Sequence, residues 1–194
     1  MAARRRGARG HPPGGLQEAR PAADRRRRRT EEAGGLKPFD AYLHAVLTRA
    51  AVDARDDGST TVEAQHLLLA VAAEPEPTAR PALEAVGLDR DGVRRALDRE
   101  FEHSLGAVGV SAAAYDLPRP SRRPADPTIG TSTRLALDRG FANASRKKDL
   151  RPAHLLLGIL AAQVGTVPRA LALAGVDREG LIARVRAALT TEED

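Results

Sequence analysis

Residues 66–70 read His-Leu-Leu-Leu-Ala, and residues 154–158 read His-Leu-Leu-Leu-Gly, an offset of 88 residues (66 to 154). The same offset carries a second motif, Gly-Leu-Asp-Arg-Asp-Gly-Val at 87–93, onto Gly-Val-Asp-Arg-Glu-Gly-Leu at 175–181. No gap is needed between the two motifs in either copy. Because chance does not readily align two motifs at one spacing, the body of the chain is interpreted as a tandem duplication.

The spacing of apolar residues predicts four helices in the first copy. One runs through Tyr42 and ends at Gly58, since its apolar residues recur every three to four positions. A strongly apolar second helix is expected from about residue 64 to 73, before the prolines that follow it. A short third helix is expected at 81–86. Asp89 is expected to cap a fourth, with apolar residues on either side of the cap.

The second copy repeats these signals. Pro152 suits the first turn of its second helix, and Asp177 stands where Asp89 stands in the first copy. The second helix of each copy is apolar nearly all round, which predicts a central, buried position. Its apolar run is far too short to span a membrane, and no membrane association is expected.

The composition agrees with a helical core. The 194 residues contain no Cys, no Trp and only 3% aromatic residues, so the core must consist mainly of Ala, Leu and Val. Such a core favours helices over a β-sandwich or barrel. We therefore predict an all-α fold of tandem duplicated four-helix units, about eight helices in all. The absence of Cys also excludes disulfides and thiol chemistry, and it fits a cytoplasmic location.

The net charge of +5 is concentrated in one segment. Residues 1–36 hold ten Arg and four acids, a net charge of +6, so the remaining residues carry −1. This segment has too few large apolar residues to offset the entropy cost of ordering and is predicted to be a disordered tail. It is either functional or lies upstream of the true start of translation. A salt-sensitive contact with nucleic acid is the alternative function that the tail suggests, through the run Arg25, Arg26, Arg27, Arg28 and Arg29.

No catalytic constellation emerges from the sequence. The lysines Lys37, Lys147 and Lys148 do not follow glycine, so the chain lacks a P-loop and no ATP hydrolysis by that route is expected. His66 and His154 have no second ligand recurring at metal spacing and are interpreted as structural histidines at helix starts. We expect no enzyme activity, cofactor or metal.

The duplicated unit, with His-Leu-Leu-Leu opening its second helix and Gly-aliphatic-Asp preceding its fourth, resembles the Clp amino-terminal (Clp R) domain. The resemblance covers roughly residues 39–189. It implies a domain at 37–190, in which repeat one (39–105) and repeat two (131–190) flank a linker (106–130). It also implies a docking role like that of the front domain of Clp-type AAA+ unfoldases, here in a stand-alone form. The partners would be a Clp-type AAA+ unfoldase or Clp peptidase, client proteins, or both.

The chain departs from the family pattern in two respects, and these limit which family properties we expect it to share. Many family members have Glu before the motif histidine, where some read phosphoarginine on substrates, but this chain has Gln65 and Ala153. Because a guanidinium needs an anionic partner, we do not expect phosphoarginine recognition. The linker is also longer than is usual in the family. We predict a docking surface between the repeats, near the starts of their second helices, at Gln65, His66, Ala153 and His154.

Overall fold

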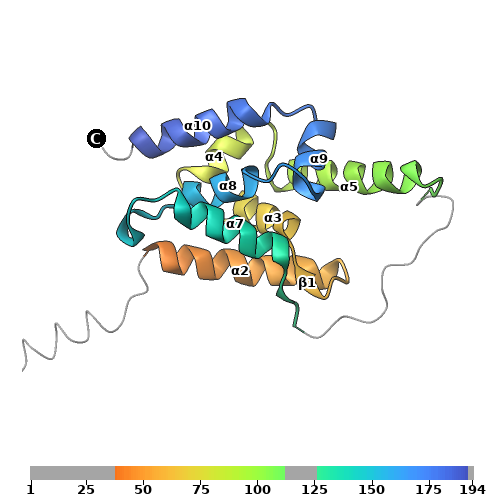
Figure 1. Cartoon of the computed structure of the whole chain (residues 1–194), viewed down its shortest axis with the longest axis horizontal. Coiled ribbons are helices and arrows are strands. Elements are labelled where there is room, and N and C mark those ends of the chain that lie inside the picture. Colours follow the sequence, from red (N-terminus) through yellow and green to blue (C-terminus); the bar gives the residue numbers. More distant parts are fainter. Residues whose placement is uncertain (1–37, 112–125, 192–194) are drawn as a thin grey trace, which may run out of the picture. The chain divides into compact units, whose positions relative to one another are not determined.

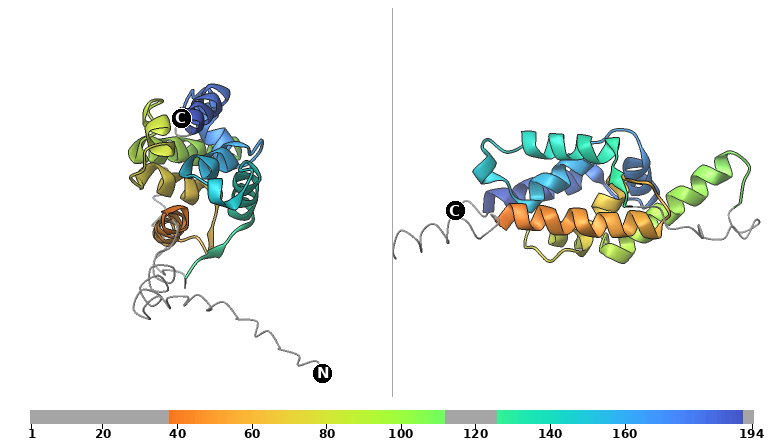
Figure 2. Two further views of the ribbon diagram at one scale, coloured as in Figure 1. Left: turned by 90° about the vertical axis from the view of Figure 1, so that its left-hand side faces the viewer. Right: turned by 90° about the horizontal axis from the view of Figure 1, so that it is seen from below.

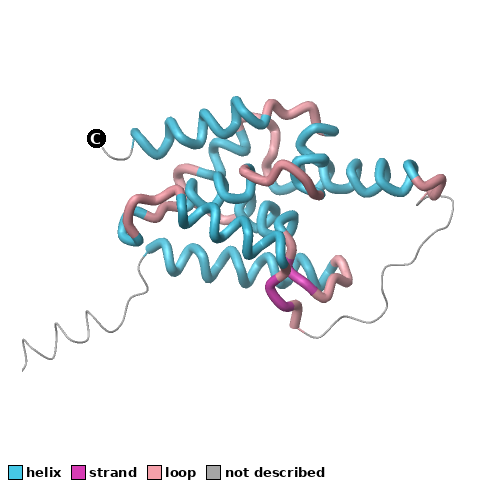
Figure 3. The backbone as a smooth tube through the Cα atoms, in the orientation of Figure 1, coloured by secondary structure: helices cyan, strands magenta, loops and turns pink. Residues whose placement is uncertain are grey.

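The computed structural model describes residues 38–111 and 126–191. The predicted disordered tail (1–36) and much of the predicted linker (106–130) therefore lie outside the described residues. Within the two described ranges the chain forms eight α-helices, one short 3₁₀ helix and two strands of two residues each (Figure 1). The tube view in Figure 3 shows how little of this part of the chain is strand. The predicted all-α fold is confirmed.

The first copy contains the four predicted helices and one strand. These are α2 (Pro38–Asp56), β1 (Thr61–Val62), α3 (Ala64–Ala73), α4 (Ala79–Glu84) and α5 (Arg90–Ala107). Helix α4 begins two residues before the expected start at Pro81. A proline in the third helical position sacrifices no hydrogen bond, because the N–H groups of a first turn have no acceptor within the helix.

The second copy repeats this order. It contains β2 (Thr128–Ile129), α7 (Thr131–Ala142), the 3₁₀ helix η1 (Lys147–Asp149), α8 (Pro152–Leu160), α9 (Thr166–Leu173) and α10 (Arg178–Thr191). The 88-residue offset carries the starts of α3, α4 and α5 onto those of α8, α9 and α10 to within one residue. The repeat in the sequence is thus a repeat of helices. The last helix of each copy begins in the same way, because Asp89 accepts from the Gly92 N–H (2.7 Å) and Asp177 from the Gly180 N–H (3.1 Å).

Helices α3 and α8 form the centre of the core. Every residue of α8 after Pro152 is buried, and so are most residues of α3. Helix α3 packs against α2, α4 and α5, and Figure 2 (left) shows it above α2, which is seen end-on. The leucines predicted to be buried are buried in both copies.

Helices α7 and α8 approach each other so closely that glycine is required between them. A Cβ at Gly158 would meet the Ala136 carbonyl oxygen and would lie 2.6 Å from the Gly140 nitrogen. Position 158 corresponds to Ala70 in the first copy. The single difference between the two quoted stretches, Ala against Gly, therefore reflects closer helix packing in the second copy.

The two strands join the copies and were not predicted. They pair in parallel, with Thr61 opposite Thr128 and Val62 opposite Ile129. Strands of two residues are too short for the alternation that marks strands in a sequence. Residues 128–129 fall within the predicted linker, so the end of that segment is part of the domain's hydrogen-bonded structure.

Next to the strands, each copy caps a helix of the other. The Ser132 hydroxyl accepts a hydrogen bond from the Ala64 N–H at the start of α3 (2.8 Å). The Glu63 carboxylate in turn accepts from the N–H of Ser132 (3.1 Å) and from its hydroxyl, at the start of α7. A side chain on Gly130 would collide with the Glu63 carboxylate. The Ser132 hydroxyl, which lies at the start of α7, thus also caps a helix of the other copy.

Candidate functional site

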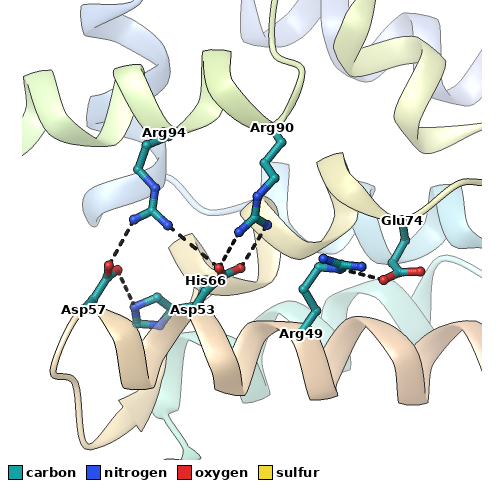
Figure 4. Close-up of polar contacts among 7 residues, drawn as sticks. All are labelled: Arg49, Asp53, Asp57, His66, Glu74, Arg90 and Arg94. Atoms are coloured by element: carbon teal, nitrogen blue, oxygen red, sulfur yellow. Dashed lines mark hydrogen bonds and ion pairs between the residues drawn. The ribbon is translucent and has the colours of Figure 1, made fainter. Parts of the chain in front are cut away.

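The two motif histidines occupy equivalent places. Each is the third residue of its helix, and its Nδ1 accepts the N–H of the residue just before the helix: Glu63 for His66 and Arg151 for His154, both at 3.0 Å. His66 is only 1% exposed, and its Nε2 lies 3.4 Å from an oxygen of Asp57 (Figure 4). Both nitrogens of His66 are therefore engaged. This is the structural role that the sequence predicted for these residues.

The structure does not bring the four predicted docking residues together. The start of α3, with Gln65 and His66, is held at Ser132, near the beginning of α7. The start of α8 lies by Gly140, near the end of α7, because a Cβ on that glycine would be 2.9 Å from the His154 carbonyl oxygen. Eight helical residues separate Ser132 from Gly140, a rise of about 12 Å. The two pairs thus belong to opposite ends of α7.

Burial also limits what these residues can contact. His66, His154 and Ala153 are all buried, and Gln65 is only partly exposed. Such side chains offer little surface to a protein partner. Their part in docking remains a prediction, and it would have to act through the helix starts that they stabilise.

Beside His66, charged side chains tie α2 to α5 (Figure 4). Asp53 is buried, and its two oxygens accept from Arg90 at 2.6 and 3.2 Å. Arg94 donates to Asp57 at 3.0 Å. Burial alone would raise the pKa of Asp57, but the hydrogen bond from His66 and the charge and hydrogen bond of Arg94 outweigh it and hold the pKa below its ordinary value.

This network holds helices together, and nothing described around it points to catalysis. A hydrolytic triad needs a histidine nitrogen free to take a proton from a nucleophile, and both nitrogens of His66 are occupied. In the described ranges no group of three or more His, Asp or Glu side chains is placed to hold a metal ion. Among the helices of the same ranges, none is long and apolar enough to cross a membrane.

A groove of about 850 Å³ lies on another part of the surface. Its walls come from the start of α2, the connection between α3 and α4, and the connection between α7 and α8. Its lining residues are Pro38, Phe39, Asp40, Tyr42, Pro75, Glu76, Pro77, Thr78, Lys147, Lys148, Leu150, Arg151 and Pro152. We call this hollow the α2–α8 groove. Both repeats contribute to it, and its volume is in the range of known ligand sites.

Aromatic rings and prolines form the apolar part of the α2–α8 groove. The ring of Phe39 packs against Tyr42, with ring centres 6.5 Å apart, and edge-on against Phe141 of α7 at 6.3 Å. These contacts join the first helices of the two copies. The hydroxyl of Tyr42 is buried and has no hydrogen-bond partner among the described residues. Burial and the nearby carboxylates Glu76 and Glu74 raise the pKa of Tyr42, so its hydroxyl keeps its proton and can donate it.

The groove is not recognisable in the sequence, because its lining comes from three separate segments. Only the fold places Phe39 opposite Lys147 and Pro77. The weak signals in the sequence are the two prolines around Glu76 at 75–77 and the paired lysines at 147–148. By themselves the prolines indicate only the end of a helix, and the lysines, which follow no glycine, indicate only the lack of a P-loop.

Two copies of a four-helix unit, built on buried central helices and sharing a groove, define a duplicated helical repeat domain. The sequence model for the Clp repeat (R) N-terminal domain family matches residues 38–122, so this segment is similar to that domain. No curated protein matches the chain. The match covers the first copy, and the second copy is tied to it by the 88-residue offset and by the recurrence of its helices.

Proposed function

We propose that this chain is a non-catalytic protein-binding module that acts as an accessory or adaptor in Clp-type proteolysis or protein disaggregation. The observation that supports this most is the α2–α8 groove, an apolar hollow on a domain similar to the Clp repeat domain. The partners proposed are a Clp-type AAA+ unfoldase, a Clp peptidase, or client proteins that they process.

The chemistry of the groove suits an extended segment of protein. Exposed prolines at 38, 75 and 77 and the faces of Phe39 and Tyr42 offer apolar area with little conformational freedom to lose. Rigid apolar surfaces bind well because less side-chain entropy is lost on association. Aromatic side chains are also enriched among residues that dominate binding energy at protein interfaces.

A pulldown with the full-length chain as bait tests the proposal. We expect it to retain a Clp-type ATPase, a Clp peptidase or an unfolded client protein, identified by mass spectrometry. Phe39→Ser should abolish this retention, because it removes the ring between Tyr42 and Phe141. The matched control is Phe101→Ser, which removes an exposed ring on α5 that does not line the groove.

Retention of such a protein by the unchanged chain and by Phe101→Ser, but not by Phe39→Ser, would support docking in the groove. If neither a Clp component nor an unfolded protein is enriched, the proposal is wrong. Loss of retention in both variants would show that the partner does not bind in the groove. Binding of nucleic acid through the Arg-rich tail, the alternative from the sequence, remains a prediction, since residues 1–36 lie outside the described ranges.

A further inference from the structure

The α2–α8 groove carries opposite charges on its two sides. Lys147, Lys148 and Arg151 stand on the α7–α8 side, and all three are exposed. Asp40 and Glu76 stand on the α2 and α3–α4 side. We call the three cations the basic rim. A ligand lying in the groove would meet positive charge along one edge only.

The basic rim is not neutralised within the described part of the chain. Elsewhere in it many arginines pair with carboxylates, as in Arg90 with Asp53, Arg94 with Asp57 and Arg169 with Glu100. No described carboxylate forms an ion pair with a cation of the basic rim. Arg151 is held by its Nη1, which donates to the carbonyl oxygens of Lys148 (3.3 Å) and Leu150 (3.2 Å).

The acidic side of the groove is more fully engaged. One oxygen of Glu76 accepts from both the N–H and the hydroxyl of Thr78 at 2.7 Å, and the other accepts from the Arg80 N–H. Hydrogen bonds of this kind hold a carboxylate in place and spread its charge over the backbone. Three cations of the groove thus stand against two carboxylates, one of which is already hydrogen-bonded, so the net charge that a ligand would meet is positive.

The Tyr42 hydroxyl is a second polar group of the groove that lacks a partner among the described residues. A buried hydroxyl without an acceptor is less stable than one that donates a hydrogen bond. A carbonyl oxygen of a bound peptide backbone would satisfy it. The groove thus presents an apolar surface, one hydrogen-bond donor and the basic rim.

Resting on the docking role proposed above, we infer that the α2–α8 groove selects an extended peptide segment in which apolar residues are followed by acidic ones. The apolar residues of the peptide lie against Phe39 and Tyr42, and one of its backbone carbonyl oxygens accepts a hydrogen bond from the Tyr42 hydroxyl. Its acidic side chains pair with the basic rim. A single-stranded nucleic acid fits less well, because its continuous negative charge would also run along Asp40 and Glu76.

Fluorescence anisotropy with the full-length chain tests this selection. The probe is a labelled peptide in which the apolar core Pro-Leu-Phe-Pro precedes three glutamates, and the comparison peptide carries three glutamines instead. We expect the glutamate peptide to bind about five- to tenfold more tightly, since each exposed ion pair contributes up to about 1 kcal/mol. The preference should weaken as salt is added.

Two charge-reversed variants locate the preference. Lys147→Glu with Lys148→Glu should lose most of the preference for the glutamate peptide. Arg184→Glu with Arg186→Glu makes the same change in net charge on α10, at exposed residues outside the groove, and should keep the preference. The Arg-rich segment at 1–36 is present in every protein compared, so its attraction for acidic peptides does not separate them. Tyr42→Phe should weaken the binding of both peptides to the same extent.

The outcomes separate this inference from the proposed function. Equal binding of both peptides, lost in Phe39→Ser, would overturn the acidic selection and leave docking in the groove intact. An equal loss of preference in both charge-reversed variants would show a net-charge effect and overturn it too, as would the absence of binding by either peptide. Tighter binding of a thymidine oligonucleotide, lost on reversing Lys147 and Lys148, would identify nucleic acid as the occupant instead.

Discussion

At the scale of single residues, position 63 and its counterpart 151 show how two equivalent places in a duplication diverge. Glu63 precedes α3 and caps the start of α7 across the copies. Arg151 precedes α8, cannot accept hydrogen bonds, and stands on the basic rim of the groove instead. At both positions, 63 and 151, the backbone N–H donates a hydrogen bond to the motif histidine of the same copy. The shared histidine therefore preserves the helix start, while the residue three places before it is free to join the copies or to face a ligand.

Replacing Glu63 by Gln should destabilise the chain at neutral pH by about 1–2 kcal/mol, through weaker hydrogen bonds to Ser132. Burial alone would raise the pKa of Glu63, but hydrogen bonds from Ser132 and Thr61 outweigh it and hold the pKa below its ordinary value. A carboxylate with a lowered pKa in the fold stabilises it at neutral pH, and this contribution disappears as the pH falls through the folded pKa.

Thermal unfolding at pH 7 and pH 3 measures this effect. The difference in Tm between the unchanged chain and Glu63→Gln should be clear at pH 7 and should shrink at pH 3. Glu102→Gln, at an exposed position on α5, is the control and should differ little at either pH. A difference for Glu63→Gln that stays the same at pH 3 would show that the Glu63 charge does not stabilise the fold.

At the level of helices and strands, local sequence predicts where each helix begins and ends. The distance between two packed helices depends on the size of the residues at their contact. The two caps, Asp89 and Asp177, and the first-turn Pro152 were predictable, because each acts on backbone groups within a few residues. The closeness of α7 and α8 was not, because it depends on a neighbour from another part of the chain. Glycine at 158 and 140 allows that approach.

Gly158→Ala should therefore destabilise the chain by about 1–3 kcal/mol, because the added methyl group must push α7 away from α8. Gly106→Ala, in α5, is a matched change with no atom within 4 Å of the new methyl group. It should leave stability unchanged or raise it by up to about 1 kcal/mol, as Ala favours helix more than Gly. Urea unfolding compares the three proteins. Equal stability of Gly158→Ala and the unchanged chain would contradict the tight contact between α7 and α8.

At the scale of the whole domain, the two copies share one hydrophobic core. Helices α3 and α8 contact each other, β1 pairs with β2, and Arg169 of α9 bonds to Glu100 of α5. Each copy thus depends on the other for part of its burial and capping. The α2–α8 groove is a product of the same arrangement, since its walls come from both copies.

The two copies should consequently unfold in a single transition. Leu68→Ala and Leu156→Ala remove equivalent buried side chains from the two central helices, and each should destabilise the domain by about 2–5 kcal/mol. Both should lower the midpoint of the same transition, followed by circular dichroism and by hydrogen exchange in each copy. Separate transitions, each shifted by only one substitution, would contradict the shared core.

The duplication, the helices, their caps and the buried leucine runs can all be predicted from the amino-acid sequence. These depend on apolar periodicity and on contacts between residues close in the chain, such as the bonds of His66 and His154 at the starts of their own helices. Four features are visible only in the folded chain: the strand pair, the exchange of caps through Glu63 and Ser132, the separation of the predicted docking residues, and the α2–α8 groove. Each of these depends on distances between segments far apart in sequence, and local patterns of hydrophobicity and charge do not encode such distances.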